Sequence, residues 1–268
     1  MNTLLHEGKT LYYQSSGEGP ALLLLHGFCA DHRIWEAVLP RLERRYRVLR
    51  PDLPGCGRSE ALEGAGNIGA MAEAVRALLR HEGISQAVVI GHSMGGYVAL
   101  ELAATHPDCL AGMGLVHSHP YDRLDEAETK TRQRSIDFVR KFGSALYIKQ
   151  LVPALFPAGY SDRTVLEKIS YWACETPAAG IIACQEAMRN RRDHTATLAD
   201  LTIPVLQLHG GRDPLIPEAV TEAMSILAPA GSVHWLPRTG HMGMWEDPKA
   251  TGKILRDFAD FCQSNTDR

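Results

Sequence analysis

Short apolar runs alternate with amphipathic stretches along the first half of the chain. Each run is continuous, which is typical of a strand that is buried on both faces of a sheet. The spacing of apolar residues between the runs predicts helices. We expect strands at residues 21–25, 46–50, 86–90 and 110–116, separated by helices at 34–44, 71–81 and 94–105. This alternation predicts parallel β–α–β units in an open α/β sheet, preceded by a hairpin of residues 3–6 and 10–14.

The alternation breaks between residues 120 and 198, where helical patterns follow one another without a convincing strand. The helices expected there cover residues 125–142, 145–155, 164–174 and 178–189. Later elements are strands at 204–209 and 232–236 and a helix at 248–262. We therefore predict one α/β domain in two parts, residues 1–119 and 199–268, interrupted by a helical insertion at 120–198.

A glycine-rich segment, Gly91-His92-Ser93-Met94-Gly95-Gly96, joins a predicted buried strand directly to a predicted helix. A sharp turn between a strand and a helix strains the central residue and requires small neighbours. Such a turn would expose the hydroxyl of Ser93, and the first N–H groups of the helix would point at the same place. We therefore predict that Ser93 is a nucleophile, with a simple turn serine as the alternative.

A serine hydroxyl needs a base to remove its proton, and the base needs an acid to orient it. Asp213 follows the strand predicted at 204–209, and His241 follows the strand predicted at 232–236. The carboxyl ends of parallel strands gather catalytic groups at one edge of a sheet. We expect Ser93, Asp213 and His241 to meet there as a triad. Taken singly, Asp213 could instead cap a helix and His241 could be a surface loop residue.

Acyl transfer also needs N–H donors that hold the oxyanion of the tetrahedral intermediate. The residue after the nucleophile, Met94, is expected to provide one donor. The loop His26-Gly27-Phe28 after the first buried strand is expected to provide the other, and we choose Phe28. Gly27 lets the backbone approach closely. His26 could be catalytic, but we favour a structural role in bracing this loop.

Composition argues against several classes of function. The chain has 268 residues, a net charge of -3 and no basic block, so we expect no nucleic-acid partner. It has neither the pattern of a signal peptide nor an apolar run long enough to cross a bilayer, so we expect no membrane partner. The six cysteines are scattered, and we expect free thiols in a cytoplasmic protein. His117 and His119 form at most a weak metal pair, so we expect no metal and no cofactor.

The segments that contain Phe28, Ser93, Asp213 and His241 resemble the α/β-hydrolase superfamily, whose triads follow the order Ser, Asp, His. The segment Asp52-Leu53-Pro54-Gly55-Cys56-Gly57-Arg58-Ser59 adds to this resemblance. The resemblance covers about residues 10–118 and 200–265. It implies an eight-stranded, mostly parallel sheet with helices on both faces and a mobile helical cap over the pocket. Haloalkane dehalogenases and soluble epoxide hydrolases carry aspartate at the nucleophile position. Serine there implies the branch of esterases, lactonases, thioesterases and carbon–carbon bond hydrolases.

From these observations we predict a serine esterase that cleaves a small, fairly apolar carboxylic ester through an acyl-enzyme. The same triad acting on a carbon–carbon bond or an enol-lactone is an alternative. A hydrolase that has lost its activity and binds a small ligand is a further one. The expected partner is thus a small-molecule ester.

Overall fold

A central sheet of eight strands organises the computed structural model, which describes residues 2–62, 66–123 and 125–266. The strands are β1 (Asn2–His6), β2 (Lys9–Ser16), β3 (Ala21–Leu25), β4 (Arg47–Pro51), β5 (Ala87–His92), β6 (Leu110–Val116), β7 (Val205–Gly210) and β8 (Gly231–Leu236). Their order across the sheet is β1-β2-β4-β3-β5-β6-β7-β8. The pairings of β1 with β2 and of β2 with β4 are antiparallel, and those from β4 to β8 are parallel. The expected mostly parallel, eight-stranded α/β sheet is confirmed.

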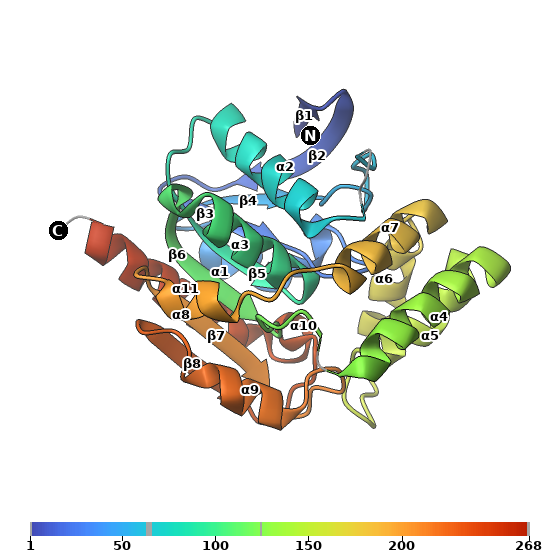
Figure 1. Ribbon diagram of the computed structural model, residues 1–268. Coiled ribbons are helices and arrows are strands. Elements are labelled where there is room, and N and C mark those ends of the chain that lie inside the picture. The colour runs from blue at the N-terminus through green and yellow to red at the C-terminus, as the bar shows by residue number, and fades with distance from the viewer. Residues whose placement is uncertain (1, 63–65, 124, 267–268) are drawn as a thin grey trace.

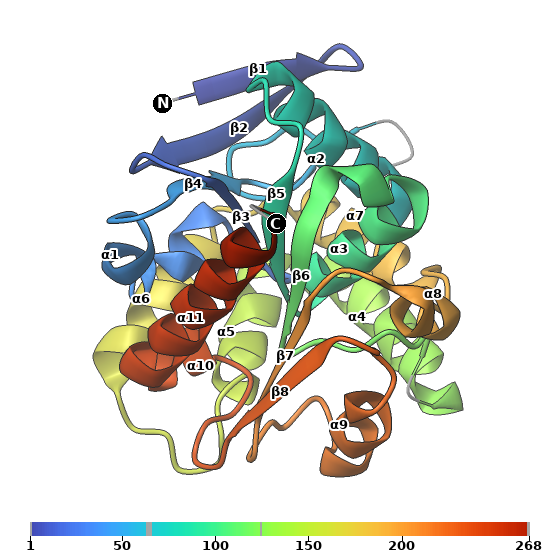
Figure 2. The ribbon, with the colours of Figure 1, turned by 90° about the vertical axis from the view of Figure 1, so that its left-hand side faces the viewer.

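Helices connect the parallel strands and cover both faces of the sheet (Figures 1 and 2). Those outside the long connection from β6 to β7 are η1 (His32–Trp35), α1 (Leu39–Leu42), α2 (Ile68–His81), α3 (Met94–Thr105), η2 (Pro107–Cys109), α9 (Glu218–Ser225), α10 (Gly243–Glu246) and α11 (Pro248–Thr266). Those within that connection are α4 (Glu126–Phe142), α5 (Ser144–Ala154), α6 (Arg163–Ala173), α7 (Ala178–Arg189) and α8 (Thr195–Asp200).

Alternate side chains of the central strands enter two hydrophobic cores, one on each face of the sheet. In β3, Leu23 and Leu25 pack into the core that contains residues of α2 and α3. Leu22 and Leu24 pack into the other core, which contains residues of α1 and α11. All four side chains are fully buried. Because helices cover both faces, these strands need apolar residues at every position, which explains the continuous apolar runs.

The helices α4 to α8 form one insertion between β6 and β7, which are neighbours in the sheet. Figure 1 shows α4 to α7 grouped beside the sheet and its covering helices. Asp125 caps the start of helix α4, where its side chain accepts the N–H of Glu128 (2.8 Å), and Gly143 caps its end. Helix α8 differs from the others because it packs on α3. The chain therefore leaves the sheet at the carboxyl end of β6, and the insertion lies near that edge.

The expectation of one helix over residues 34–44 is wrong, because the chain forms η1 and α1 with a turn between them. Pro40 lies in the first turn of α1. A proline has no N–H to bond back to a preceding helical turn but is tolerated in the first turn of a helix, so η1 stops before it and α1 starts with it. The short helices α8, α9 and α10 were not expected. They have 6, 8 and 4 residues, too few for an apolar period to stand out.

Candidate active site

The turn between β5 and α3 places Ser93 in a strained conformation, with φ 49° and ψ −114°. Three hydrogen bonds hold this backbone. The N–H of Ser93 donates to the carbonyl of Val116 (2.9 Å), and its own carbonyl accepts the hydroxyl of Ser118 (2.8 Å) and the N–H of Gly96 (2.9 Å). Strain of this kind persists only where the surrounding structure imposes it, and it collects at functional sites. The geometry is that expected of a nucleophile turn.

Gly95, in the first turn of α3, packs directly against the end of β3. A Cβ atom at this position would lie 2.5 Å from the carbonyl oxygen of Leu25 and 2.7 Å from that of His26. Both are backbone atoms that cannot rotate away, so the close packing requires glycine.

Replacing Gly95 with alanine is therefore expected to destabilise the protein by about 3 kcal/mol, the upper end of ordinary overpacking costs. Urea unfolding of the Gly95→Ala variant measures this. Gly252→Ala is the matched control, because Gly252 lies inside α11 and its new Cβ would come close to the movable side chain of Arg41 (2.9 Å), with Val38 at an ordinary contact distance of 3.5 Å. The control should change stability by less than about 1 kcal/mol. Equal losses in the two variants would contradict this account.

Asp213 and His241 come from the loops after β7 and β8, and the fold brings them into direct contact. Nδ1 of His241 donates to Oδ2 of Asp213 at 2.8 Å. The other carboxylate oxygen, Oδ1, accepts the N–H groups of Leu215 (2.8 Å) and Ile216 (3.1 Å). Both side chains are almost completely buried. With its proton on Nδ1, the imidazole keeps Nε2 free to accept a proton.

The surroundings of Asp213 keep it ionised although it is buried. Burial by itself raises the pKa of this carboxyl group. Attraction to His241 and the contacts with His117 and His241 overcome burial and hold the pKa of Asp213 well below its usual range. The carboxylate can therefore stabilise a positive charge on His241 when that residue takes up a proton.

His117, directly after β6, is a second histidine at the same carboxylate. The N–H of Gly243 donates to its Nε2 (3.3 Å), which leaves the ring proton on Nδ1, at 3.5 Å from Oδ2 of Asp213. Burial lowers the pKa of His117, so the ring is neutral. In the sequence, this residue stands out only as half of a weak metal pair with His119. The signal that could have placed it in the site is its position at the carboxyl end of β6, between the strands that lead to Ser93 and Asp213.

His92 and Glu246 fix the backbone on which His241 is mounted. Nε2 of His92 donates to the carbonyl of His241 (2.9 Å). Burial, and then the nearby His241 and His117, lower the pKa of His92 well below its ordinary value, so it is neutral. The carboxylate of Glu246 accepts the N–H groups on either side of His241, from Gly240 (2.7 Å) and Met242 (2.9 Å). The orientation of the His241 ring is therefore set by its loop as well as by Asp213.

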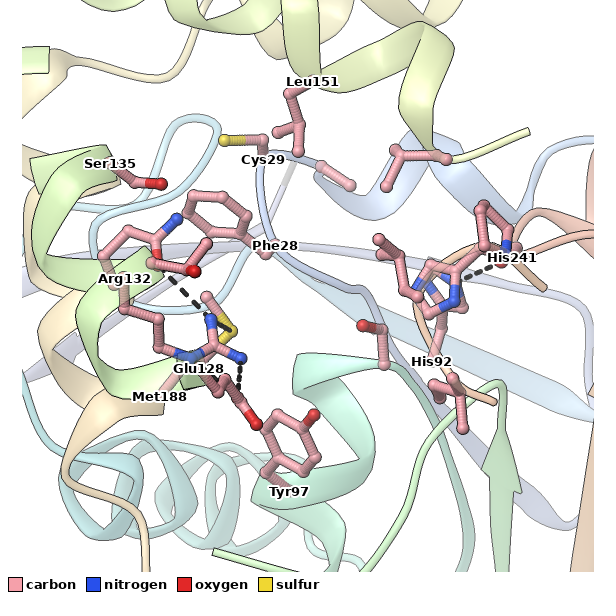
Figure 3. A pocket seen from close by; sticks show the side chains of 18 of the residues that line it. Phe28, Cys29, His92, Tyr97, Glu128, Arg132, Ser135, Leu151, Met188 and His241 are labelled. Atoms are coloured by element: carbon pink, nitrogen blue, oxygen red, sulfur yellow. Dashed lines mark hydrogen bonds and ion pairs between the residues drawn. The ribbon is translucent and has the colours of Figure 1, made fainter. Parts of the chain in front are cut away.

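Ser93 and His241 both line a cavity of about 400 Å³. Phe28 and Met242 contribute apolar wall, helices α4, α5 and α7 of the insertion contribute much of the rest, including Leu151, and loops at the sheet edge complete it. Figure 3 shows His92 and His241 on one side of this space and Glu128 and Arg132 on the other, with Phe28 between them. The three predicted triad residues thus come from separate strand ends, and two of them face a common, mainly apolar space suited to a small ligand.

The two predicted oxyanion donors lie on either side of the serine turn. Met94 begins α3 directly after Ser93, and Phe28 lies in the loop after β3. Within residues 2–62, 66–123 and 125–266, neither N–H has a hydrogen-bond partner. The loop approaches the serine closely, because a Cβ atom on Gly27 would lie 3.2 Å from that of Ser93. Both donors are therefore available to a ligand.

His26 and Asp52 are occupied in holding loops. Nε2 of His26 accepts the N–H of Leu53 (2.8 Å), and its Nδ1 donates to the carbonyl of Gly27 (2.8 Å). Asp52 accepts the side chain of His32 (2.7 Å) and the N–H of Arg58 (2.9 Å). Asp31, His32 and Asp52 have the donor atoms of a small metal site, but these internal bonds already use them. Nε2 of His119 lies 3.0 Å from the hydroxyl of Tyr97, whereas His117 contacts Asp213.

Comparison with known proteins adds an independent line of information. A family model described as "Alpha/beta hydrolase family" matches residues 22–253. A pimeloyl-[acyl-carrier protein] methyl ester esterase of Yersinia enterocolitica is 29% identical, over 96% of this chain and 100% of that protein. A solved esterase of Thermogutta terrifontis is 30% identical, covers 95% of this chain and 94% of its own, and has a TM-score of 0.89. The enol-lactonase of Burkholderia xenovorans is 25% identical with a TM-score of 0.89, over 96% and 99% of the two chains.

The family match extends from β3 into α11 and so includes both parts of the sheet and the helices between them. Its span contains the serine turn, the contact between Asp213 and His241, and the cavity wall. Sequence, topology and solved structures therefore agree. The chain belongs to the alpha/beta hydrolase family.

Proposed function

We propose that this protein is a serine hydrolase that cleaves a small carboxylic ester through an acyl-enzyme. The observation that carries the proposal is the buried hydrogen bond between Asp213 and His241, beside a cavity that the strained Ser93 also lines. Relatives named as esterases support the reaction class. The expected site residues are Ser93 as nucleophile, His241 as base and Asp213 as the orienting acid.

In the first half of the reaction, Nε2 of His241 takes the proton of Ser93 while Oγ attacks the ester carbonyl. The carbonyl oxygen becomes negative, and the free N–H groups of Phe28 and Met94 stabilise it. Collapse of this intermediate expels the alcohol, which receives the proton from His241, and leaves the acyl group on Ser93. Water activated by His241 then releases the acid in the second half. Throughout, the ionised Asp213 stabilises the protonated imidazole.

An enol-lactone is the second candidate substrate class, because a lactone is an internal ester and needs the same steps. The similarity to the Burkholderia xenovorans enol-lactonase favours this candidate over cleavage of a carbon–carbon bond. The two ester classes differ in shape rather than in chemistry, so the cavity decides between them.

The helices between residues 120 and 198 are proposed to act as a cap that selects the substrate, because α4, α5 and α7 form much of the cavity wall. We further propose a cytoplasmic location, which the six free cysteines support. In the part of the chain that the structure describes, no helix combines the length and apolar character needed to cross a membrane.

Labelling with a fluorophosphonate tests the nucleophile, because this reagent reacts with activated serines. We expect one label, on the peptide that contains Ser93, and hydrolysis of p-nitrophenyl esters that depends on acyl length. An enol-lactone assayed in parallel separates the two substrate classes. Protein denatured before labelling is the control and should remain unmodified. A folded protein that neither takes the label nor turns over any ester or lactone would contradict the proposal and favour a ligand-binding role.

A further inference from the structure

A charged cluster occupies the wall of the cavity opposite His241 (Figure 3). Arg132 of α4 donates from Nε (2.9 Å) and from a terminal nitrogen (2.6 Å) to one oxygen of Glu128. Its other terminal nitrogen donates to the amide oxygen of Gln185 (3.3 Å) and to the thioether of Met188 (3.4 Å), both on α7. All four residues line the cavity. This mainly apolar space therefore has one strongly polar end.

Positive charge is in excess among the enclosed groups of this cluster. Arg191, whose side chain is buried, also donates to Glu128 (3.0 Å) and lies over the ring of Tyr97. Two guanidinium groups thus share one carboxylate. The remaining acid on this wall, Asp125, is exposed and accepts a backbone N–H at the start of α4, so solvent screens it. An anion that entered the cavity would complete the charge balance of the two arginines.

The terminal nitrogen of Arg132 that faces α7 has weak partners. A thioether sulfur is a poor acceptor, and the amide of Gln185 is at the long end of hydrogen-bond distance. A carboxylate accepts stronger, charge-assisted bonds from a guanidinium and can replace such partners. Nearby His119 adds no competing positive charge, because burial and then Arg191 lower its pKa to about 3. The cluster is thus suited to an incoming carboxylate.

We propose that Arg132 binds a free carboxylate at the far end of the acyl group, so that the preferred substrate is a monoester of a dicarboxylic acid. This inference rests on the proposed function, since it assumes that the acyl group is held on Ser93. The acyl group stays in the cavity through both halves of the reaction, and a carboxylate on it would therefore use Arg132 in both. Apolar wall between the two ends, from Phe28 and Leu151, suits the methylene chain.

The test compares mono-p-nitrophenyl esters of succinic, adipic and suberic acids with the same esters in which the free carboxylate is a primary amide. For at least one chain length, we expect the wild-type protein to favour the ester with a free carboxylate over the matching amide by about tenfold or more in kcat/KM. That ratio corresponds to the free energy of one hydrogen bond to a charged group. Arg132→Gln should abolish this ratio, and Arg132→Lys should restore part of it. The matched control is Arg134→Gln, which removes an exposed charge from the same helix and should leave the ratio unchanged.

Binding of adipate to the Ser93→Ala protein, measured by calorimetry, tests Arg132 without any turnover. We expect the Ser93→Ala protein to bind adipate, and we expect the double variant Ser93→Ala/Arg132→Gln to bind it about tenfold more weakly. Equal or greater preference for the amides, or adipate binding that does not depend on Arg132, would overturn the proposal. Adipate binding through Arg132 in a protein that hydrolyses no ester would instead refute the proposed function and leave this site standing.

Discussion

Replacing Ser93 with alanine is expected to lower kcat/KM for p-nitrophenyl esters by about 10⁴-fold or more, because the variant lacks the hydroxyl on which the acyl-enzyme is proposed to form. What activity remains should come from the oxyanion donors and from substrate binding alone. The free energy of unfolding should stay within about 0.5 kcal/mol of the wild type, because the bonds that hold this turn are made by backbone atoms of Ser93.

The measurement is steady-state hydrolysis by purified protein, with urea unfolding of the same preparations. Ser225→Ala is the control, because this serine is only partly buried on α9 and its hydroxyl donates to the carbonyl of Glu222 in the same helix. It should retain full activity. Substantial turnover by Ser93→Ala, above about one part in a hundred of the wild-type rate, would be incompatible with the assigned nucleophile, given the expected size of the loss.

Mild acid is expected to destabilise the fold strongly, through buried histidines that stay neutral. Burial lowers the pKa of His119 to about 3 and that of His209 to about 4, whereas both have ordinary values near 6.5 in the unfolded chain. Below pH 6.5 the unfolded chain therefore binds more protons than the folded one, and stability falls as the pH falls. Two such histidines cost about 1.4 kcal/mol each per pH unit, or about 5 kcal/mol between pH 6.5 and 4.5. That is a large part of the stability of an ordinary domain.

Urea unfolding at several values between pH 7.5 and 4.5 measures this loss. The variant His209→Gln should reduce the slope of stability against pH by about one proton, because that residue no longer titrates in the unfolded chain. His234→Gln, on the neighbouring edge strand β8, replaces a histidine that solvent reaches, and it should change the slope less than His209→Gln does. A flat profile in the wild-type protein, or equal effects of both substitutions, would show that the buried histidines do not control acid stability.

The positions of Ser93, Asp213 and His241 at the ends of strands were predictable from sequence, because strands and turns are signalled by residues close together in the chain. The turn residues around Ser93 and the apolar strand before it indicate a strand–turn–helix, and Asp213 follows the apolar strand β7. His241 follows β8, an edge strand that is more polar and half exposed, so its strand was the weaker signal. Parallel strands bring such ends to one edge, and the structure places the two side chains in contact there. The roles of these residues in catalysis remain a prediction that the variants above test.

Features that depend on contacts between distant segments could not be predicted in this way. His117 contacts Asp213 only because β6 and β7 are neighbours, and the sequence around it has no motif of its own. Arg132 and Glu128 look like an ordinary i, i+4 pair on the surface of a helix. Only the packing of α4 against α7 turns that pair toward a cavity. Pro40 itself is a sequence signal for a break between two helices, whereas the spacing of apolar residues alone predicts one helix over residues 34–44.

The insertion of α4 to α8 has a consequence for how this protein can change. The chain departs from β6 and returns to β7, which lie side by side, so the two junctions of the whole segment sit on adjacent strands. Lengthening, shortening or exchanging that segment would alter the walls of the cavity while Ser93, Asp213 and His241 stay on untouched parts of the chain. The entropic cost of a different length grows only slowly. A new acyl specificity can thus be engineered, or can evolve, by exchange of this one segment while the residues expected to carry out the reaction stay unchanged.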